Sequence, residues 1–156
     1  MKSLTLKIIV CALGCLVLGT ASGFSTMDSI ATWYQYLNKP SFNPPNWVFG
    51  PVWTVLYLMM GAALALVWHT VHADKKRAYL LFALQFVLNL AWSFLFFNLH
   101  ALGGAFIEII AMLIAIILTI IAFYKINKTA AYLLIPYACW VSFASLLNFS
   151  IWILNK

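Results

Sequence analysis

The chain has very little charge for its length. Of its 156 residues, 8% are charged and only three are acidic, whereas soluble domains carry about 25% charged residues. Hydrophobic residues make up 65% of the chain, and the mean hydropathy is +1.00. A water-soluble domain of this size has too much surface to hide so many apolar side chains. The composition therefore excludes a soluble enzyme, a nucleic-acid-binding module and a disordered tail, and it predicts a polytopic membrane protein.

Several motifs of common chemistries are also missing from the sequence. It contains no P-loop, dinucleotide fingerprint, HExxH motif or nucleophile elbow. Its three cysteines, Cys11, Cys15 and Cys139, lie in apolar stretches, which predicts small buried side chains rather than disulfides. No tight Cys/His cluster is present, although His69 and His72 lie one turn apart and leave a metal or haem site as an alternative. We expect no required cofactor, no metal and no nucleic-acid partner.

Charged residues divide the chain into five long apolar stretches. A helix needs about 20 apolar residues to cross a bilayer, and the alternating pattern of a membrane β-barrel is absent. The sequence therefore predicts an all-α integral membrane protein, with residues 1–156 forming a single five-helix transmembrane domain. The predicted helices cover residues 6–25, 47–71, 78–98, 102–124 and 130–154. The first stretch also has the features of a secretory signal, but its glycines equally suit close helix packing.

The long connection at residues 26–46 is rich in proline and aromatic residues. Prolines prevent a regular helix, and amphipathic aromatics favour the membrane interface. We expect a short interfacial helix at residues 33–37, with Asp28 as its cap. The alternative is an aromatic belt with a stiff turn and no binding role.

Basic residues are distributed unequally between the two ends of the predicted bundle. With five spans, the N-terminus and the second and fourth connections share one side. Seven of the nine Lys and Arg residues fall on that side, and they are Lys2, Lys7, Lys75, Lys76, Arg77, Lys125 and Lys128. Only Lys39 and Lys156 fall on the other side. The positive-inside rule then predicts a cytoplasmic N-terminus and a long connection on the far side of the membrane.

Large aromatics and buried amides share faces of the predicted helices. The stripes at helical spacing are Trp53, Tyr57, Met60 and Leu64; Gln85, Asn89, Trp92 and Phe96; and Trp140, Ala144, Leu147 and Ile151. Because a polar side chain facing lipid is costly, Gln85, Asn89, Asn148 and Glu108 should face the bundle interior. These faces are consistent either with a cavity for a flat ligand or with ordinary helix packing. Glu108 is either a functional carboxyl group, such as a proton relay, or a protonated or snorkelling side chain.

Three sequence motifs carry a family resemblance. Residues 33–61 read WYQYLNKPSFNPPNWVFGPVWTVLYLMMG, residues 89–97 read NLAWSFLFF, and residues 136–148 read PYACWVSFASLLN. In this order and at this chain length, the sequence resembles the translocator protein family, also called the tryptophan-rich sensory protein or peripheral benzodiazepine receptor family. The short ends of the chain are similar to those of a bacterial member, which implies a bacterial cell membrane as its location.

The resemblance implies a five-helix membrane fold, often dimeric, with a ligand pocket that opens toward the first long connection. It implies porphyrins such as protoporphyrin IX and benzodiazepine-type compounds as ligands. The pocket residues implied by the matching motifs are Tyr34, Trp53, Tyr57, Asn89, Trp140, Ala144 and Leu147. Animal members also bind cholesterol through a Tyr and an Arg after the last Leu-Asn pair. Here Phe149 replaces the Tyr and Lys156 lies too far along, so the sequence argues against cholesterol.

Three functional hypotheses follow. The first is a tetrapyrrole-binding sensor or transporter. The second is a light-dependent protoporphyrin IX-degrading activity, in which Trp53 and Trp140 act photochemically beside the bound porphyrin. The third is a membrane scaffold that binds small molecules without transport. We also expect a homodimer packed through small residues of the fourth span, namely Ala101, Gly103, Gly104, Ala105, Ala111 and Ala115. The third span, with Ala83 and its aromatics, is the alternative face.

Overall fold

The structure is a computed structural model that describes residues 3–156, and these residues form an all-α protein. Five helical segments are long and apolar enough to cross a membrane, which confirms the predicted fold class. The elements are α1 (Leu4–Phe24), α2 (Met27–Thr32), η1 (Tyr34–Tyr36), α3 (Asn46–His69), α4 (Lys76–Ser93), η2 (Phe94–Asn98), α5 (Leu102–Ile126), α6 (Lys128–Leu133) and α7 (Ile135–Leu154).

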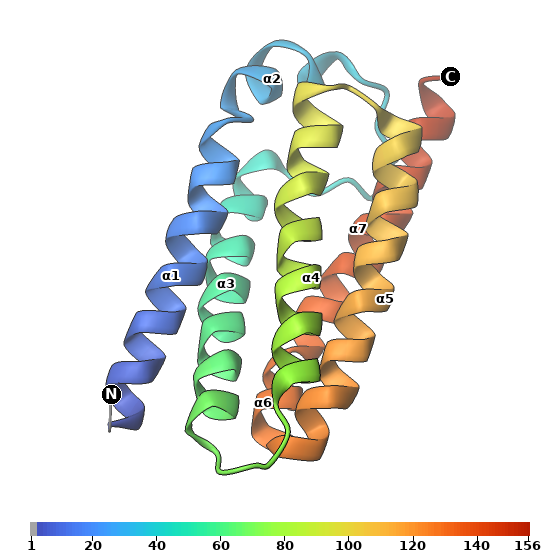
Figure 1. Ribbon diagram of the computed structural model, residues 1–156. Helices are drawn as coiled ribbons and strands as arrows, with labels where there is room; N and C mark the ends of the chain where they lie inside the picture. Colours follow the sequence, from blue (N-terminus) through green and yellow to red (C-terminus); the bar gives the residue numbers. More distant parts are fainter. Residues whose placement is uncertain (1–2) are drawn as a thin grey trace.

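The long helices run side by side (Figure 1), and the connections at the two ends of the bundle differ in their residues. Helix α1 packs on α3, α4 packs on α5, and α5 packs on α7. The start of α1 and the α3–α4 and α5–α6 connections lie at one end. We call this the basic end, and its described basic residues are Lys7, Lys75, Lys76, Arg77, Lys125 and Lys128. Lys2, which was predicted at the basic end, lies outside the described residues. The opposite end contains α2, η1 and the C-terminus, and we call it the aromatic end.

Two of the predicted spans are irregular. The fifth is divided at Leu134 into α6 and α7, because Pro136 has no backbone N–H to donate and its ring crowds the carbonyl one turn earlier. The third ends in η2, a π-helical turn in which the Leu99 N–H donates to the Phe94 carbonyl. In the long connection, the short helix predicted at residues 33–37 lies earlier in the chain, as α2. Thr26 rather than Asp28 is the N-cap residue of α2, and residues 34–36 form only a 3-10 turn.

Two glycines allow α1 and α3 to approach closely. A Cβ atom at Gly61 of α3 would collide with the backbone of Ala12 and Cys11 in α1. A Cβ atom at Gly19 of α1 would collide with the ring of Tyr57 in α3. The first span therefore lies close against the second, with backbone contact at Gly61 and ring contact at Gly19, as small residues allow between membrane helices.

The surface and the interior of the bundle differ as a lipid solvent requires. Apolar side chains such as Val17 and Ile107 are 62% and 71% exposed, which suits a surface covered by hydrocarbon chains. The amides of Gln85, Asn89 and Asn148 are at most 3% exposed. The prediction that these amides face the interior is therefore confirmed.

The small residues of the fourth span are largely used inside one protomer. Ala105 is 0% exposed and Ala115 is 3% exposed. A Cβ atom at Gly103 would press on the indole of Trp152. Only Gly104 and Ala111 of this set are exposed. The surface of small residues that α5 offers to a second protomer is therefore narrower than the sequence pattern indicates.

Candidate functional site: an aromatic cavity in the bundle

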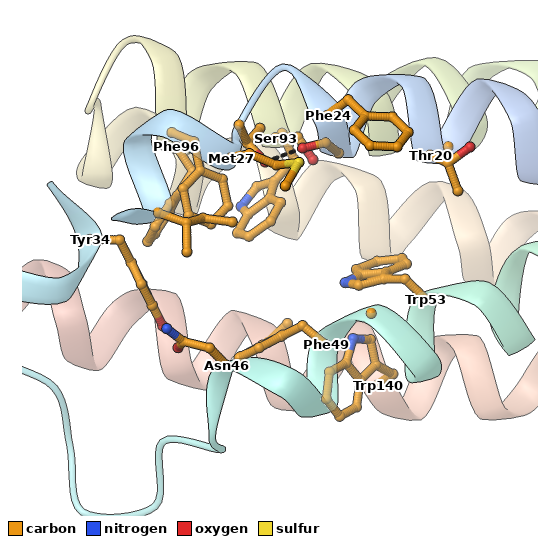
Figure 2. A pocket seen from close by; sticks show the side chains of 18 of the residues that line it. Thr20, Phe24, Met27, Tyr34, Asn46, Phe49, Trp53, Ser93, Phe96 and Trp140 are labelled. Carbon is orange, nitrogen blue, oxygen red and sulfur yellow. Dashed lines mark hydrogen bonds between the residues drawn. The ribbon is translucent and has the colours of Figure 1, made fainter. Parts of the chain in front are cut away.

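A cavity of about 390 Å³ lies within the half of the bundle nearest the aromatic end (Figure 2). Its walls come from α1, α2, η1, α3, the α4–η2 segment and α7. The size falls within the roughly 300–1,000 Å³ of small-molecule sites. Most of the lining side chains are apolar or aromatic, so the cavity suits a flat, largely apolar molecule.

Two indoles form the inner wall of the cavity. Trp53 of α3 and Trp140 of α7 lie close together there, while Tyr34 stands at the other end (Figure 2). The Trp53 ring stacks on Tyr57 with centroids 5.6 Å apart, and the Trp140 ring meets Phe49 edge-on at 6.0 Å. Such aromatic pairs restrain the orientation of both rings. The two indoles are therefore held in place without a ligand.

A polar network lies beneath the inner wall. The Tyr57 hydroxyl donates to Asn89 Oδ1 at 2.8 Å, and Asn89 Nδ2 donates to the Tyr137 hydroxyl at 3.0 Å. The network joins α3, α4 and α7, and all three residues are buried. Because the Tyr57 hydroxyl is already bonded, its ring rather than its polar atom is available to the cavity.

The structure also distinguishes between the indole N–H groups. Trp92 Nε1 donates to Asn148 Oδ1 at 3.0 Å, and Asn148 Nδ2 donates to the Leu102 carbonyl at 3.0 Å. Trp140 Nε1 is buried and has no hydrogen-bond partner among residues 3–156. A buried donor without a partner is energetically unfavourable, so Trp140 Nε1 is a candidate anchor for an acceptor atom of a ligand.

The connection between α1 and α3 closes the aromatic end of the cavity. The Tyr34 side chain is 5% exposed, and its hydroxyl donates to Asn43 Oδ1 at 3.1 Å. Burial raises the pKa of Tyr34 above its ordinary value, although the bond to Asn43 opposes this. The hydroxyl therefore stays protonated at neutral pH. The Lys39 ammonium lies 4.6 Å from the centre of the Tyr34 ring, which places a positive charge beside the cavity.

The π-helical turn η2 brings further rings to the same end. Phe96 and Phe97 both lie near Tyr34, with centroids 6.1 and 5.6 Å away. Consecutive residues of a regular helix point about 100° apart, and the wider turn allows both rings to line the cavity. Single π-helical turns are frequent at functional sites.

Most of the predicted pocket residues meet at this cavity. Tyr34, Trp53, Tyr57, Trp140, Ala144 and Leu147 line it. Asn89 does not line the cavity, and the structure places it in the network behind Tyr57. The lining residues that sequence reasoning did not place on any inward face include those of α1 and α2, namely Gly19, Thr20, Gly23, Phe24, Met27 and Ile30. Their stretch carries no aromatic stripe, so only the packing of α1 against α3 indicates them.

The other candidate residues lie away from the cavity. Both carboxyl oxygens of Glu108 are buried and have no partner in the described chain, so its predicted interior orientation is confirmed. His72 Nδ1 lies 3.0 Å from the Asp74 carbonyl oxygen at the basic end. All three cysteines are free. Cys15 is buried as predicted, but Cys139 is exposed because it points away from the bundle on α7.

The fold and the cavity define a class of protein: a multi-pass α-helical membrane protein with an aromatic cavity among its helices. A family model described as the TspO/MBR family matches residues 11–153. The tryptophan-rich protein TspO of Archaeoglobus fulgidus is 44% identical over 150 residues, which cover 96% of this chain and 97% of the relative. The chain belongs to the TspO/MBR family.

Two further relatives come from organisms that are distant from each other. The human translocator protein is 38% identical over 123 residues, covering 77% of this chain and 73% of the relative. The protein CrtK of Rhodobacter capsulatus is 33% identical over 138 residues, covering 86% of each chain. The family and the five apolar helices together make this an integral multi-pass membrane protein.

Proposed function

We propose that the protein is a membrane tetrapyrrole-binding sensor or transporter and that the aromatic cavity is its binding site. The observation that carries this proposal is the pair of indoles, Trp53 and Trp140, on one wall of an apolar cavity. A porphyrin is a large flat aromatic molecule that can stack on such rings. Protoporphyrin IX is the porphyrin that we propose, and benzodiazepine-type compounds are smaller aromatic ligands for the same cavity.

Polar anchors beside the cavity support a ligand that carries acceptor groups. Trp140 Nε1 is a buried donor without a partner. Lys39 supplies a positive charge next to Tyr34, and protoporphyrin IX carries two carboxylates. An apolar site with a few fixed polar groups is the usual composition of a small-molecule site. The cavity walls would bind the ring, and the anchors would orient its acceptors.

A binding titration tests this function. Protoporphyrin IX is added to the purified protein in mild detergent, and tryptophan quenching and the porphyrin absorbance band are followed together. We expect saturable binding that an uncharged benzodiazepine-type compound reduces by competition. For the quenching signal, Trp68→Phe is the matched control for Trp53→Phe and Trp140→Phe. Trp68 lies at the far end of α3, and its indole does not line the cavity. Absence of saturable binding would leave the scaffold hypothesis in place.

A second candidate function is light-dependent degradation of protoporphyrin IX. Trp53 and Trp140 favour it because their electron-rich indoles line the cavity that would hold the porphyrin. Illuminated porphyrin would react with dioxygen, which is reduced while the tetrapyrrole is oxidised, and the protein would orient the ring and exclude solvent. No required cofactor enters this proposal.

We propose that the protein lies in a bacterial cell membrane with the N-terminus in the cytoplasm. The concentration of Lys and Arg at the basic end supports this orientation. We also propose a homodimer. A mass measurement in mild detergent across a concentration series tests it, and a monomer at every concentration would contradict it. Cholesterol is not proposed as a ligand, because Phe149 packs on Phe106 and Trp152 and offers no hydroxyl.

A further inference from the structure

A second concave site lies at the basic end, on the outer surface between α4 and α5. It is a groove of about 220 Å³, far from the aromatic cavity along the bundle. The residues that line it are His72, Asp74, Arg77, Ala78, Leu118, Ile121, Ala122, Lys125 and Ile126. The groove therefore combines two cationic side chains with a wall of aliphatic ones.

The two cations of the groove are not neutralised within the chain. Neither Arg77 nor Lys125 has an ion-pair or hydrogen-bond partner among the side chains that the structure describes. Asp74 is the only acidic residue of the lining, and its Oδ1 accepts the backbone N–H of Lys76 at 3.1 Å. Two basic side chains and one carboxylate thus give the groove an excess of one positive charge beside an apolar surface.

The apolar wall extends from the charged end toward the middle of the membrane. Leu118 precedes Lys125 by two turns of α5, which corresponds to roughly 10 Å at about 1.5 Å per residue. Leu118 and Ile121 are 39% and 50% exposed and face the hydrocarbon region. A soluble anion would use only the cations, whereas a lipid would use the cations and the wall together.

From this combination we propose that the groove binds one anionic phospholipid at the basic end of the bundle. Arg77 and Lys125 would contact the phosphate of the headgroup, and one acyl chain would lie on Leu118 and Ile121. Basic pockets between membrane helices recognise anionic headgroups in this way. Zwitterionic lipids bind more weakly, because their own cation repels the two basic side chains.

Counting bound lipids by native mass spectrometry tests the proposal. The purified protein in mild detergent is titrated with phosphatidylglycerol or, in parallel, with phosphatidylcholine of the same acyl chains. We expect one phosphatidylglycerol to bind at concentrations where phosphatidylcholine does not. Since each basic side chain near an anionic lipid contributes roughly a fivefold gain in affinity, Arg77→Gln with Lys125→Gln should weaken binding about 25-fold.

The chain offers a control with the same change in charge. Lys76→Gln with Lys128→Gln removes two basic side chains of the same end that do not line the groove. This control should keep its phosphatidylglycerol, and equal losses in both double variants would overturn the proposal in favour of a diffuse charge effect. Equal binding of the two lipids by the unmodified protein would also overturn it.

A third experiment distinguishes a bound lipid from a bound free phosphate. Glycerol phosphate has the headgroup chemistry without acyl chains, and we expect it not to displace the bound lipid at matched concentration. Leu118→Ser should weaken phosphatidylglycerol binding while leaving the folded state intact by circular dichroism. Full displacement by glycerol phosphate, or unchanged lipid binding by Leu118→Ser, would overturn the assignment of a lipid.

Discussion

The Tyr57 hydroxyl donates a 2.8 Å hydrogen bond to Asn89, and this bond joins α3 to α4 directly beneath the aromatic cavity. It satisfies the polar atom of Tyr57 and leaves the ring to stack under Trp53. Asn89 in turn donates to Tyr137 on α7. Three helices are thus fixed at one depth of the bundle, and the aromatic wall above them has a defined shape.

Enlarging the side chain of Ala144 should weaken ligand binding. Ala144 lines the cavity and lies one turn after Trp140 on α7. Ala144→Thr adds volume to a packed wall, at an expected cost of about 1–3 kcal/mol, or roughly five- to 150-fold in affinity for protoporphyrin IX. The same titration of Ser142→Thr is the control, because Ser142 is exposed on the same helix. Equal affinity of both variants and the unmodified protein would place Ala144 outside the binding site.

Trp53 and Trp140, two of the three indoles that line the cavity, should be required for light-driven loss of porphyrin. Trp53→Phe and Trp140→Phe keep an aromatic wall but remove the indole, so binding should persist, weakened in Trp140→Phe by the loss of its Nε1 donor, while bleaching under illumination slows. The rate of decay of the porphyrin band measures this, with Trp68→Phe as the control. If both cavity variants bind normally and bleach at the rate of the unmodified protein, the degradation hypothesis is wrong and binding alone remains.

Lys39 should distinguish anionic from neutral ligands. Its ammonium lies 4.6 Å from the centre of the Tyr34 ring at the cavity. Lys39→Gln should lower the affinity for protoporphyrin IX by roughly two- to fivefold, as expected for a partly solvated ion pair. The affinity for an uncharged benzodiazepine-type compound should not change. Lys156→Gln, at the same end of the bundle, is the matched control, and an equal loss for both ligands would argue against a charge effect.

Close packing of the first two spans should depend on Gly61. A Cβ atom there meets backbone atoms of α1 that no side-chain rotation can move. Gly61→Ala should therefore separate the helices at a cost of about 1–3 kcal/mol and lower the thermal midpoint in detergent by several degrees. Gly14→Ala is the control, because nothing lies within 4 Å of a Cβ atom at that position. Equal midpoints for the two variants would show that α1 adapts without loss.

Cysteine labelling should report the orientation in the membrane. Asn43→Cys lies in the connection at the aromatic end, and Ala73→Cys lies in the connection at the basic end. With the N-terminus in the cytoplasm, a membrane-impermeant thiol reagent should label the first variant and not the second in intact spheroplasts. Exposed Cys139 is replaced by Ser in both. The opposite labelling pattern would reverse the assignment.

The sequence by itself determined the five spans and the inward direction of the amides. In lipid, each backbone polar group must be bonded within its own helix, so hydropathy and length suffice to locate a span. The cost of a polar side chain in hydrocarbon likewise assigns Gln85, Asn89 and Asn148 to the interior. The aromatic stripes on α3 and α7 were sufficient to identify Trp53 and Trp140 as residues that face the interior of the bundle.

Only the tertiary structure decided which side chains meet between helices. Periodicity assigns Asn89 to the same inward face as Trp92, but in the structure its side chain bonds to Tyr57 of α3 behind the cavity wall. The contribution of α1 and α2 to the cavity depends on the close approach at Gly19 and Gly61. A face of a single helix is a local property of the chain, whereas a cavity depends on the distances and rotations of several helices, which no local pattern specifies.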